Sequence, residues 1–158
     1  MPGIVPVSEM IRQAKAKENI IYEWSSYAHY DESEETCFSL GNDIAGSKYD
    51  VAHTNWGGSW VMPSSEQIKE LADKCLSEEM IAGKKIIGPN GGSIFLPNAG
   101  YKWIDEYNND PPSGGYWSST QDPSDQNDAF NLYFQFGRNG ISKSSSGRCV
   151  GCSVRPVV

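Results

Sequence analysis

The chain has 158 residues, of which 38% are hydrophobic and 21% charged, with 16 glycines and 9 prolines. This mixture is typical of one folded, turn-rich domain rather than a disordered or fibrous protein. The net charge of −7 argues against nucleic acid or anionic lipid as a partner. No stretch approaches the roughly 20 apolar residues of a membrane-spanning helix, and residues 1–7 lack the pattern of a signal peptide.

The first residues differ in character from the rest of the chain. Ser8 is a candidate N-cap for a short helix to about Lys17, and the stretch 12–17 is basic. We predict that residues 1–19 form an arm or short helix and that residues 20–158 form the folded domain. The arm either docks on the domain, contacts a second copy of the chain, or is a partly ordered leader.

The clearest helix signal lies in the middle of the chain. Ser64 and Gln67 have the spacing of a capping box, in which two side chains satisfy free backbone N–H groups. Apolar residues then recur with the helical period from Ile68 to Leu76. The pattern predicts a helix that runs to about Glu79, with Cys75 on its buried side.

The hydrophobic period changes to two after this helix. Residues 85–87 and 93–96 flank the glycine-rich segment 88–92, which predicts a hairpin, and residues 116–119 predict a further short strand. The glycine-rich segment has no following Lys-Ser/Thr pair and no following helix. A phosphate-binding P-loop is therefore excluded.

Strict alternation predicts a half-buried antiparallel strand over residues 129–136. One face carries Phe130, Leu132, Phe134 and Phe136, and the other carries Asn131, Tyr133 and Gln135. Asn139–Gly140 is a type I′ turn signal, and residues 154–157 predict a closing strand. Helices early in the chain followed by short antiparallel strands predict an α+β fold.

Several motifs occur in a fixed order along the chain: Tyr49–His53, Trp56–Ser64, Glu70–Leu71, Gly88–Pro97, Ala99–Tyr101, Tyr116–Thr120, Leu132–Phe134 and Ser153–Val157. In this order and spacing they resemble the Fibrobacter succinogenes major paralogous domain family, which is frequent in Bacteroidetes surface proteins. The resemblance covers about residues 22–158. It implies a C-type-lectin-like fold, with two helices packed on small antiparallel β-sheets, and a location at the cell surface or outside the cell.

The C-terminal half is also similar to the variable proteins of diversity-generating retroelements. In those proteins the same fold holds a conserved frame, which matches residues 117–120, 132–134 and 153–157 here. Exposed positions between the frame motifs vary and change ligand specificity. The resemblance implies a non-catalytic ligand-binding or adhesion module.

Metal and cofactor sites have little support in the sequence. A calcium-dependent lectin site needs clustered oxygen ligands, and neither Leu96–Asn98 nor Gln126–Asp128 fits the sugar-binding motifs. Asp122, Asp125 and Asp128 are interpreted as solvated loop acids, and a weakly bound ion is the alternative. We therefore predict no metal and no cofactor.

Catalysis is also poorly supported. Cys149 and Cys152 form a C-x-x-C pair before a predicted strand, whereas redox pairs usually open a helix. We interpret the pair as structural, and a disulfide or half of a metal or redox site remain alternatives. The pairing of Cys37 and Cys75 stays open. The two histidines have no Ser or Cys motif beside them, so we predict that the chain is not an enzyme.

The tryptophans bear on ligand binding because exposed aromatic rings stack on sugars and anchor protein contacts. Trp56, Trp60 and Trp117 lie in the motifs of the resemblance and are expected in the core. Trp24 and Trp103 lie outside the strongest motifs, and the sequence leaves their exposure open.

The outward face of the last hairpin and its connections form the candidate ligand site. The residues are Asn131, Tyr133, Gln135, Arg138, Asn139, Ser142, Lys143 and Arg148. Such residue types dominate paratopes, where Tyr gives rigid contact and Asn and Ser give adaptable hydrogen bonds. An ordinary solvated strand face is the alternative.

We predict that the chain recognises a protein or a glycan through this face. One alternative is a structural or homo-oligomerising domain of a surface or virion fibre. The other is a thiol oxidase that uses Cys149 and Cys152.

Overall fold

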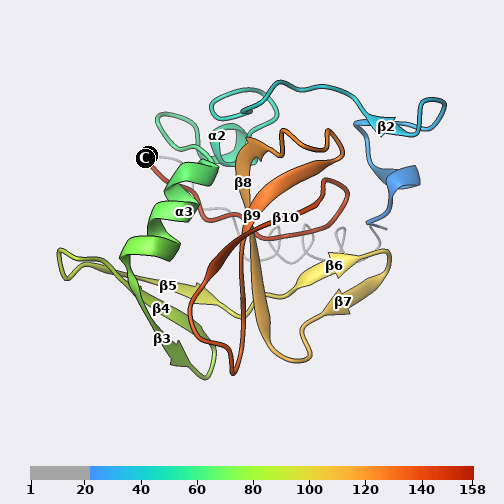
Figure 1. The fold of residues 1–158 in the computed structure, drawn as a ribbon. Coiled ribbons are helices and arrows are strands. Elements are labelled where there is room, and N and C mark those ends of the chain that lie inside the picture. The colour runs from blue at the N-terminus through green and yellow to red at the C-terminus, as the bar shows by residue number, and fades with distance from the viewer. Residues whose placement is uncertain (1–21) are drawn as a thin grey trace, which may run out of the picture.

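The computed structural model describes residues 22–158, so the predicted helix after Ser8 lies outside the described residues. Figure 1 shows a mixed α and β protein in which several small sheets lie beside one another. The elements are η1 (Trp24–Ser26), β1 (Tyr30–Asp31), β2 (Thr36–Cys37), α2 (Val51–Trp56), α3 (Ser65–Lys74), β3 (Leu76–Met80), β4 (Gly83–Ile87), β5 (Ser93–Pro97), β6 (Tyr101–Trp103), β7 (Glu106–Asn108), β8 (Ser113–Gln121), β9 (Asp128–Gln135) and β10 (Ser142–Gly147). The α+β class predicted from the sequence is confirmed.

The strands of the described residues form four antiparallel sheets. Two have three strands: the central sheet, in the order β10-β9-β8, and the lower sheet, in the order β3-β4-β5. The other two are the pairs β1-β2 and β6-β7. In Figure 1, α3 lies beside the central sheet and above the lower sheet, whereas α2 lies near one end of β8.

The hydrophobic core lies where α3 and these two sheets meet. Its buried members are Ile68 from α3, Ile86 and Leu96 from the lower sheet, and Tyr116, Leu132 and Phe134 from the central sheet. The core therefore uses one face of the central sheet and leaves the other face for other contacts.

The helix α3 begins as the sequence predicts. The Ser64 Oγ accepts from the Gln67 N–H at 3.2 Å, and the Gln67 side chain accepts from the Ser64 N–H at 2.9 Å. The predicted end at Glu79 is wrong, because the helix ends at Lys74 and Cys75 adopts an extended backbone. Cys75 packs against the core from this C-terminal position.

The residues after Cys75 form a strand because they pair with β4. Glu78 lies opposite Lys85 and Glu79 lies opposite Lys84 across this hairpin. Cross-strand pairs of opposite charge stabilise antiparallel strands, and the pairing also satisfies the backbone. Leu76, predicted on the apolar stripe of the helix, is instead largely exposed.

The hairpin around the glycine-rich segment 88–92 is confirmed as β4 and β5. The strand predicted at 116–119 is also present, within the longer β8. At the C-terminus, however, the predicted closing strand over 154–157 is wrong. Val157 forms only an isolated bridge with Val61, and Ser153 forms one with Tyr116.

The strand predicted over 129–136 is β9, and its hairpin with β10 is present. Leu132 and Phe134 lie in the core as predicted, but Phe136 is 45% exposed because the strand ends one residue earlier. The turn over 136–141 is not type I′. That turn needs positive φ at two central residues, and Gly140 has φ 78° whereas Asn139 does not have a positive φ.

Candidate functional site

The register of the central sheet gives it two chemically different faces. Tyr116 lies opposite Leu132 and Gly114 lies opposite Phe134, and these pairs belong to the core side. Because side chains alternate along a strand, the neighbouring positions point to the other side. Those positions are Gly115, Trp117, Asn131, Tyr133, Ser142, Ser144 and Ser146. A row of Gly, aromatic, amide and hydroxyl side chains therefore faces away from the core.

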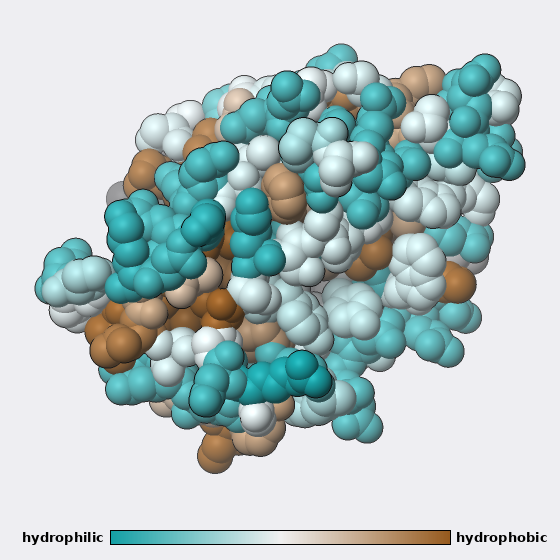
Figure 2. Space-filling view, viewed as in Figure 1, coloured by the Kyte–Doolittle hydropathy of each residue, from teal (hydrophilic) through white to brown (hydrophobic). Residues whose placement is uncertain are grey.

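A cavity of about 370 Å³ lies on this second face. Its lining consists of Tyr101, Trp103, Gly115, Asn131, Tyr133, Ser144, Ser146, Val150 and Cys152, and we call it the strand-face cavity. In Figure 2, side chains of intermediate hydropathy gather around a hollow between the central sheet and β6. Among the described residues, this lining contains no charged side chain.

One wall of the strand-face cavity comes from β6. Tyr101 and Trp103 flank Lys102, whose backbone N–H donates to the Gly151 carbonyl at 2.8 Å. The Gly151 N–H donates back to the Lys102 carbonyl at 2.9 Å. This bridge holds the two aromatic residues beside the central sheet.

Asn131 lines the strand-face cavity but does not face solvent as the sequence predicted. It is only 2% exposed, and its Nδ2 donates to the Ser146 Oγ at 2.9 Å. The prediction is wrong because the second face of the sheet is itself covered, by β6 and by the segment around Val150. Asn131 therefore orients Ser146 within the wall of the cavity.

Tyr133 is the predicted residue that best fits a ligand contact. It is half-buried and lines the strand-face cavity. Ser142 lies directly opposite it on β10 and donates to the Tyr133 carbonyl at 3.3 Å. Gln135 shares this face, but it is not part of the cavity lining.

Lys143 lies on the other side of the sheet from this group. It pairs with Leu132, which faces the core, and its Nζ lies 4.1 Å from the centroid of the Phe130 ring. The sequence analysis grouped Lys143 with Ser142 because both residues follow the turn. Neighbouring residues along a strand, however, point to opposite faces of the sheet.

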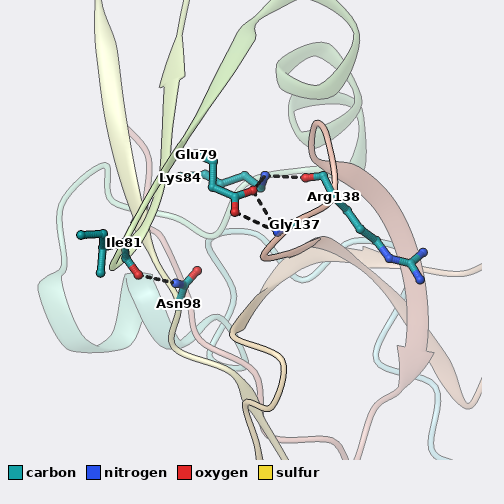
Figure 3. A network of polar contacts seen from close by, with 6 residues as sticks. All are labelled: Glu79, Ile81, Lys84, Asn98, Gly137 and Arg138. Carbon is teal, nitrogen blue, oxygen red and sulfur yellow. Dashed lines mark hydrogen bonds and ion pairs between the residues drawn. The ribbon is translucent and has the colours of Figure 1, made fainter.

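Arg138 and Asn139 are exposed in the turn and are not part of the strand-face cavity. A buried lysine fixes this turn to the lower sheet: the Lys84 Nζ donates to the Arg138 carbonyl at 2.7 Å and lies 3.2 Å from the Glu79 Oε2. The Glu79 carboxylate also accepts from the Gly137 N–H at 2.8 Å. Figure 3 shows this network, with the Arg138 guanidinium pointing away from it.

Arg148 belongs to a different part of the molecule. Its Nη1 donates to the carbonyls of Phe38 at 3.0 Å and Gln126 at 3.1 Å, and its Nε donates to the Tyr27 hydroxyl at 3.3 Å. It lines a separate cavity of about 260 Å³ that also includes His29. The structure therefore separates Arg148 from Tyr133, with which the sequence grouped it.

The tryptophans also depart from expectation. Trp56 and Trp60 are 57% and 40% exposed, so their expected place in the core is wrong. Trp56 is the last residue of the six-residue helix α2 and Trp60 lies in the loop that follows, and neither is among the buried core residues. Trp117 is half-buried and its Nε1 donates to the Val150 carbonyl at 3.2 Å. Trp103 is partly exposed at the strand-face cavity.

Among the described residues, the predicted ligand site lacks seven members of the strand-face cavity: Tyr101, Trp103, Gly115, Ser144, Ser146, Val150 and Cys152. A usable signal is the alternation of Tyr101, Lys102 and Trp103, which puts two aromatic rings on one side of a short strand. The serine run of β10 has the same period of two. Neither signal says that β6 and β10 lie near each other, because only the tertiary fold brings them together.

Asp50 is a fully buried carboxylate that the sequence analysis did not single out. Its Oδ1 accepts from the Ala52 and His53 N–H groups at 2.8 and 3.0 Å, which caps α2. Its Oδ2 accepts from the Gly46 and Met62 N–H groups at 2.9 and 3.0 Å. Burial raises the pKa of Asp50, but these four hydrogen bonds outweigh burial and lower it overall. Asp50 therefore joins three chain segments.

The four cysteines are free thiols. Burial raises the pKa of Cys149 to about 11 and that of Cys152 to about 12. Cys152 lies in the wall of the strand-face cavity, where its Sγ would be 3.2 Å from a Cβ placed on Gly115. At neutral pH both thiols are protonated, whereas nucleophilic and redox chemistry uses the thiolate.

No family model, curated protein or solved structure matches this chain. Within residues 22–158, no group of three or more His, Cys, Asp or Glu side chains is placed to hold a metal ion. In the same part of the chain, no helix has the length and apolar character needed to cross a membrane.

Proposed function

We propose that this chain is a non-catalytic binding module that holds a glycan in the strand-face cavity. The observation that carries the proposal is the composition of the lining: three aromatic rings, two serine hydroxyls and one amide, with no charged side chain among the described residues. Protein sites for neutral, hydroxyl-rich ligands need such groups, because apolar faces stack on C–H surfaces and hydroxyls exchange hydrogen bonds.

The size of the cavity supports the same ligand class. Sites for small molecules have volumes of roughly 300–1,000 Å³ and combine apolar walls with a few placed polar groups. The strand-face cavity, at about 370 Å³, has the volume for one sugar unit rather than a protein surface. Tyr101, Trp103 and Tyr133 supply the walls, while Ser144 and Ser146 supply hydroxyls.

The proposal includes the finer fold and the setting that the sequence resemblance implies. We place the chain in the Fibrobacter succinogenes major paralogous domain family, with a C-type-lectin-like fold and a location at the cell surface or outside the cell. Two α-helices beside small antiparallel sheets are compatible with that fold. Fold similarity alone does not identify a ligand, so the glycan assignment depends on the cavity.

A glycan array tests this function. The protein should bind a limited set of glycans, and Ser144→Trp should abolish binding because the new ring fills the strand-face cavity. Lys143→Trp is the matched control, since it places the same ring one residue away on the opposite face. Equal binding by both variants would contradict the proposal, and so would binding to proteins but to no glycan.

A further inference from the structure

A second and larger cavity adjoins the strand-face cavity. It has a volume of about 740 Å³, and Tyr101 and Cys152 belong to the linings of both cavities. Its other side chains include Tyr22, Asn55, Trp56, Lys102, Tyr107 and Trp117. We call it the aromatic cavity. Because the two linings share Tyr101 and Cys152, the two cavities are neighbours.

Two aromatic rings at the aromatic cavity are unusually exposed. Trp56 is 57% exposed and Tyr107 is 58% exposed, although burial of rings of this size is strongly favourable. Each ring belongs to a regular element, Trp56 to α2 and Tyr107 to β7. Trp56 is the last residue of α2, and the Tyr107 hydroxyl donates to the Ala99 carbonyl at 2.9 Å. Exposed rings of this kind are suited to stacking on a ligand.

The charge of the two cavities differs from that of the whole chain. The chain has a net charge of −7, yet neither lining contains an Asp or Glu among the described residues. Among residues 22–158, Lys102 is the single charged side chain of the two linings. Its Nζ lies 5.9 Å from the centroid of the Tyr22 ring and, within residues 22–158, forms no ion pair. A local positive site in an acidic protein favours an anionic group on the ligand.

We propose that the two cavities together form one groove for an acidic oligosaccharide, with one sugar unit in the strand-face cavity and further units on Trp56 and Tyr107. Lys102 pairs with a carboxylate or sulfate of the unit next to Tyr101. This inference rests on the proposed glycan function and deepens it, because it names the length and the charge of the ligand.

Calorimetric titrations with two pairs of probes test the groove. The first pair is tetrameric oligogalacturonate and its methyl ester, and the second is a chondroitin tetrasaccharide with and without sulfate. We expect at least one anionic tetrasaccharide to bind about tenfold or more tightly than its uncharged or less charged partner. The pair that shows this preference identifies the anion as carboxylate or sulfate. No binding of any of the four probes at about 1 mM would overturn the proposal.

Substitutions test whether the ligand also contacts the part of the groove that lies outside the strand-face cavity. Trp56→Ala should weaken binding of the preferred tetrasaccharide about tenfold, and Trp60→Ala should change it less than about twofold, because Trp60 is exposed but lines neither cavity. Lys102→Met should remove the preference for the anionic probe, whereas Lys85→Met should retain it. Unchanged thermal unfolding midpoints confirm that these surface variants are folded.

The outcomes distinguish the two proposals. If Tyr133→Ala abolishes binding but Trp56→Ala behaves like Trp60→Ala, the ligand contacts the strand-face cavity only. That result contradicts the proposal of an extended groove. If Trp56→Ala weakens binding while Tyr133→Ala and Ser144→Trp leave it intact, the proposed function of the strand-face cavity fails, and the groove fails with it.

Discussion

Gly115 lies directly opposite Tyr133 on the neighbouring strand, on the face of the central sheet that points away from the core. A Cβ at Gly115 would lie 3.2 Å from the Cys152 Sγ, which is tighter than ordinary van der Waals contact. Gly115 has the extended backbone of β8, so its backbone conformation does not require glycine. The missing side chain instead lets Cys152 lie close to the sheet and keeps the floor of the strand-face cavity free beside Tyr133.

A double-mutant cycle tests this contact. Gly115→Ala should lower the free energy of unfolding by about 1 kcal/mol, because the new methyl group presses on the Cys152 thiol. In the Cys152→Ala background the same change should be stabilising by about 0.5 kcal/mol, since alanine suits a strand better than glycine. Urea titrations of the four proteins measure the coupling. Additive effects of the two substitutions would show that the contact has no energetic consequence.

Loss of the buried Asp50 carboxylate should be strongly destabilising. Asp50→Ala leaves four backbone N–H groups without their acceptor, and we expect a loss of about 3 kcal/mol in the free energy of unfolding. Asp43→Ala is the control, because within the described part of the chain the exposed Asp43 side chain accepts a hydrogen bond from the Ala45 N–H alone. That change should cost less than about 1 kcal/mol. Equal losses for the two variants would contradict the structural role of Asp50.

The stabilisation by Asp50 should depend on pH in a defined direction. Its pKa is lowered in the folded protein, so its ionised form favours folding above the unfolded-state pKa of about 3.9. This contribution is lost as the pH falls through the lower folded-state pKa. The difference in unfolding free energy between the wild type and Asp50→Ala should therefore be constant above about pH 6 and shrink below about pH 4. A difference that widens in acid would contradict this account.

Lys84 and Lys85 should respond very differently to substitution. The Lys84 ammonium is buried between Glu79 and the Arg138 carbonyl, whereas the Lys85 Nζ lies 4.0 Å from Glu78 at the surface. We expect Lys84→Ala to lower the free energy of unfolding by about 3 kcal/mol and Lys85→Ala by less than about 0.5 kcal/mol. Hydrogen exchange should also accelerate at the Gly137 amide in the first variant alone. Equal exchange rates would show that the network does not hold the turn.

The thiols of Cys149 and Cys152 should react slowly in the native protein. Their raised pKa values keep the thiolate fraction small at pH 8, and burial restricts access. Alkylation by iodoacetamide, mapped by mass spectrometry, should therefore be much slower at both sites than in protein unfolded by urea. Rapid modification of both cysteines without unfolding would instead favour the alternative of a thiol oxidase.

The parts of the fold that the sequence predicts depend on local chemistry. Ser64 and Gln67 begin α3 because their side chains satisfy nearby backbone groups, and Leu132 and Phe134 lie in the core because alternation determines a strand face. The end of α3 was mispredicted because Leu76 continues the apolar stripe. The strand there depends on pairing of Glu78 and Glu79 with Lys85 and Lys84, and a helical pattern does not reveal this pairing.

Local sequence patterns likewise predict only part of the candidate site. Tyr133 was identified because it alternates with the buried residues of β9. The structure places Lys143 and Arg148 apart from Tyr133, because their positions depend on the register of β10 and on a distant contact with Tyr27. Tyr101 and Trp103 were missed because only the tertiary fold brings β6 to the central sheet.

Nuclear magnetic resonance with the tightest-binding glycan of the array tests the central claim most directly. Titration of the ¹⁵N-labelled protein should shift the amide signals of Gly115, Tyr133 and Ser144 and the indole signal of Trp103, because these residues line the strand-face cavity. The amides of the β3–β4 hairpin should not move. Shifts confined to that hairpin or to the cavity beside Arg148, with none at Tyr133, would contradict glycan binding in the strand-face cavity.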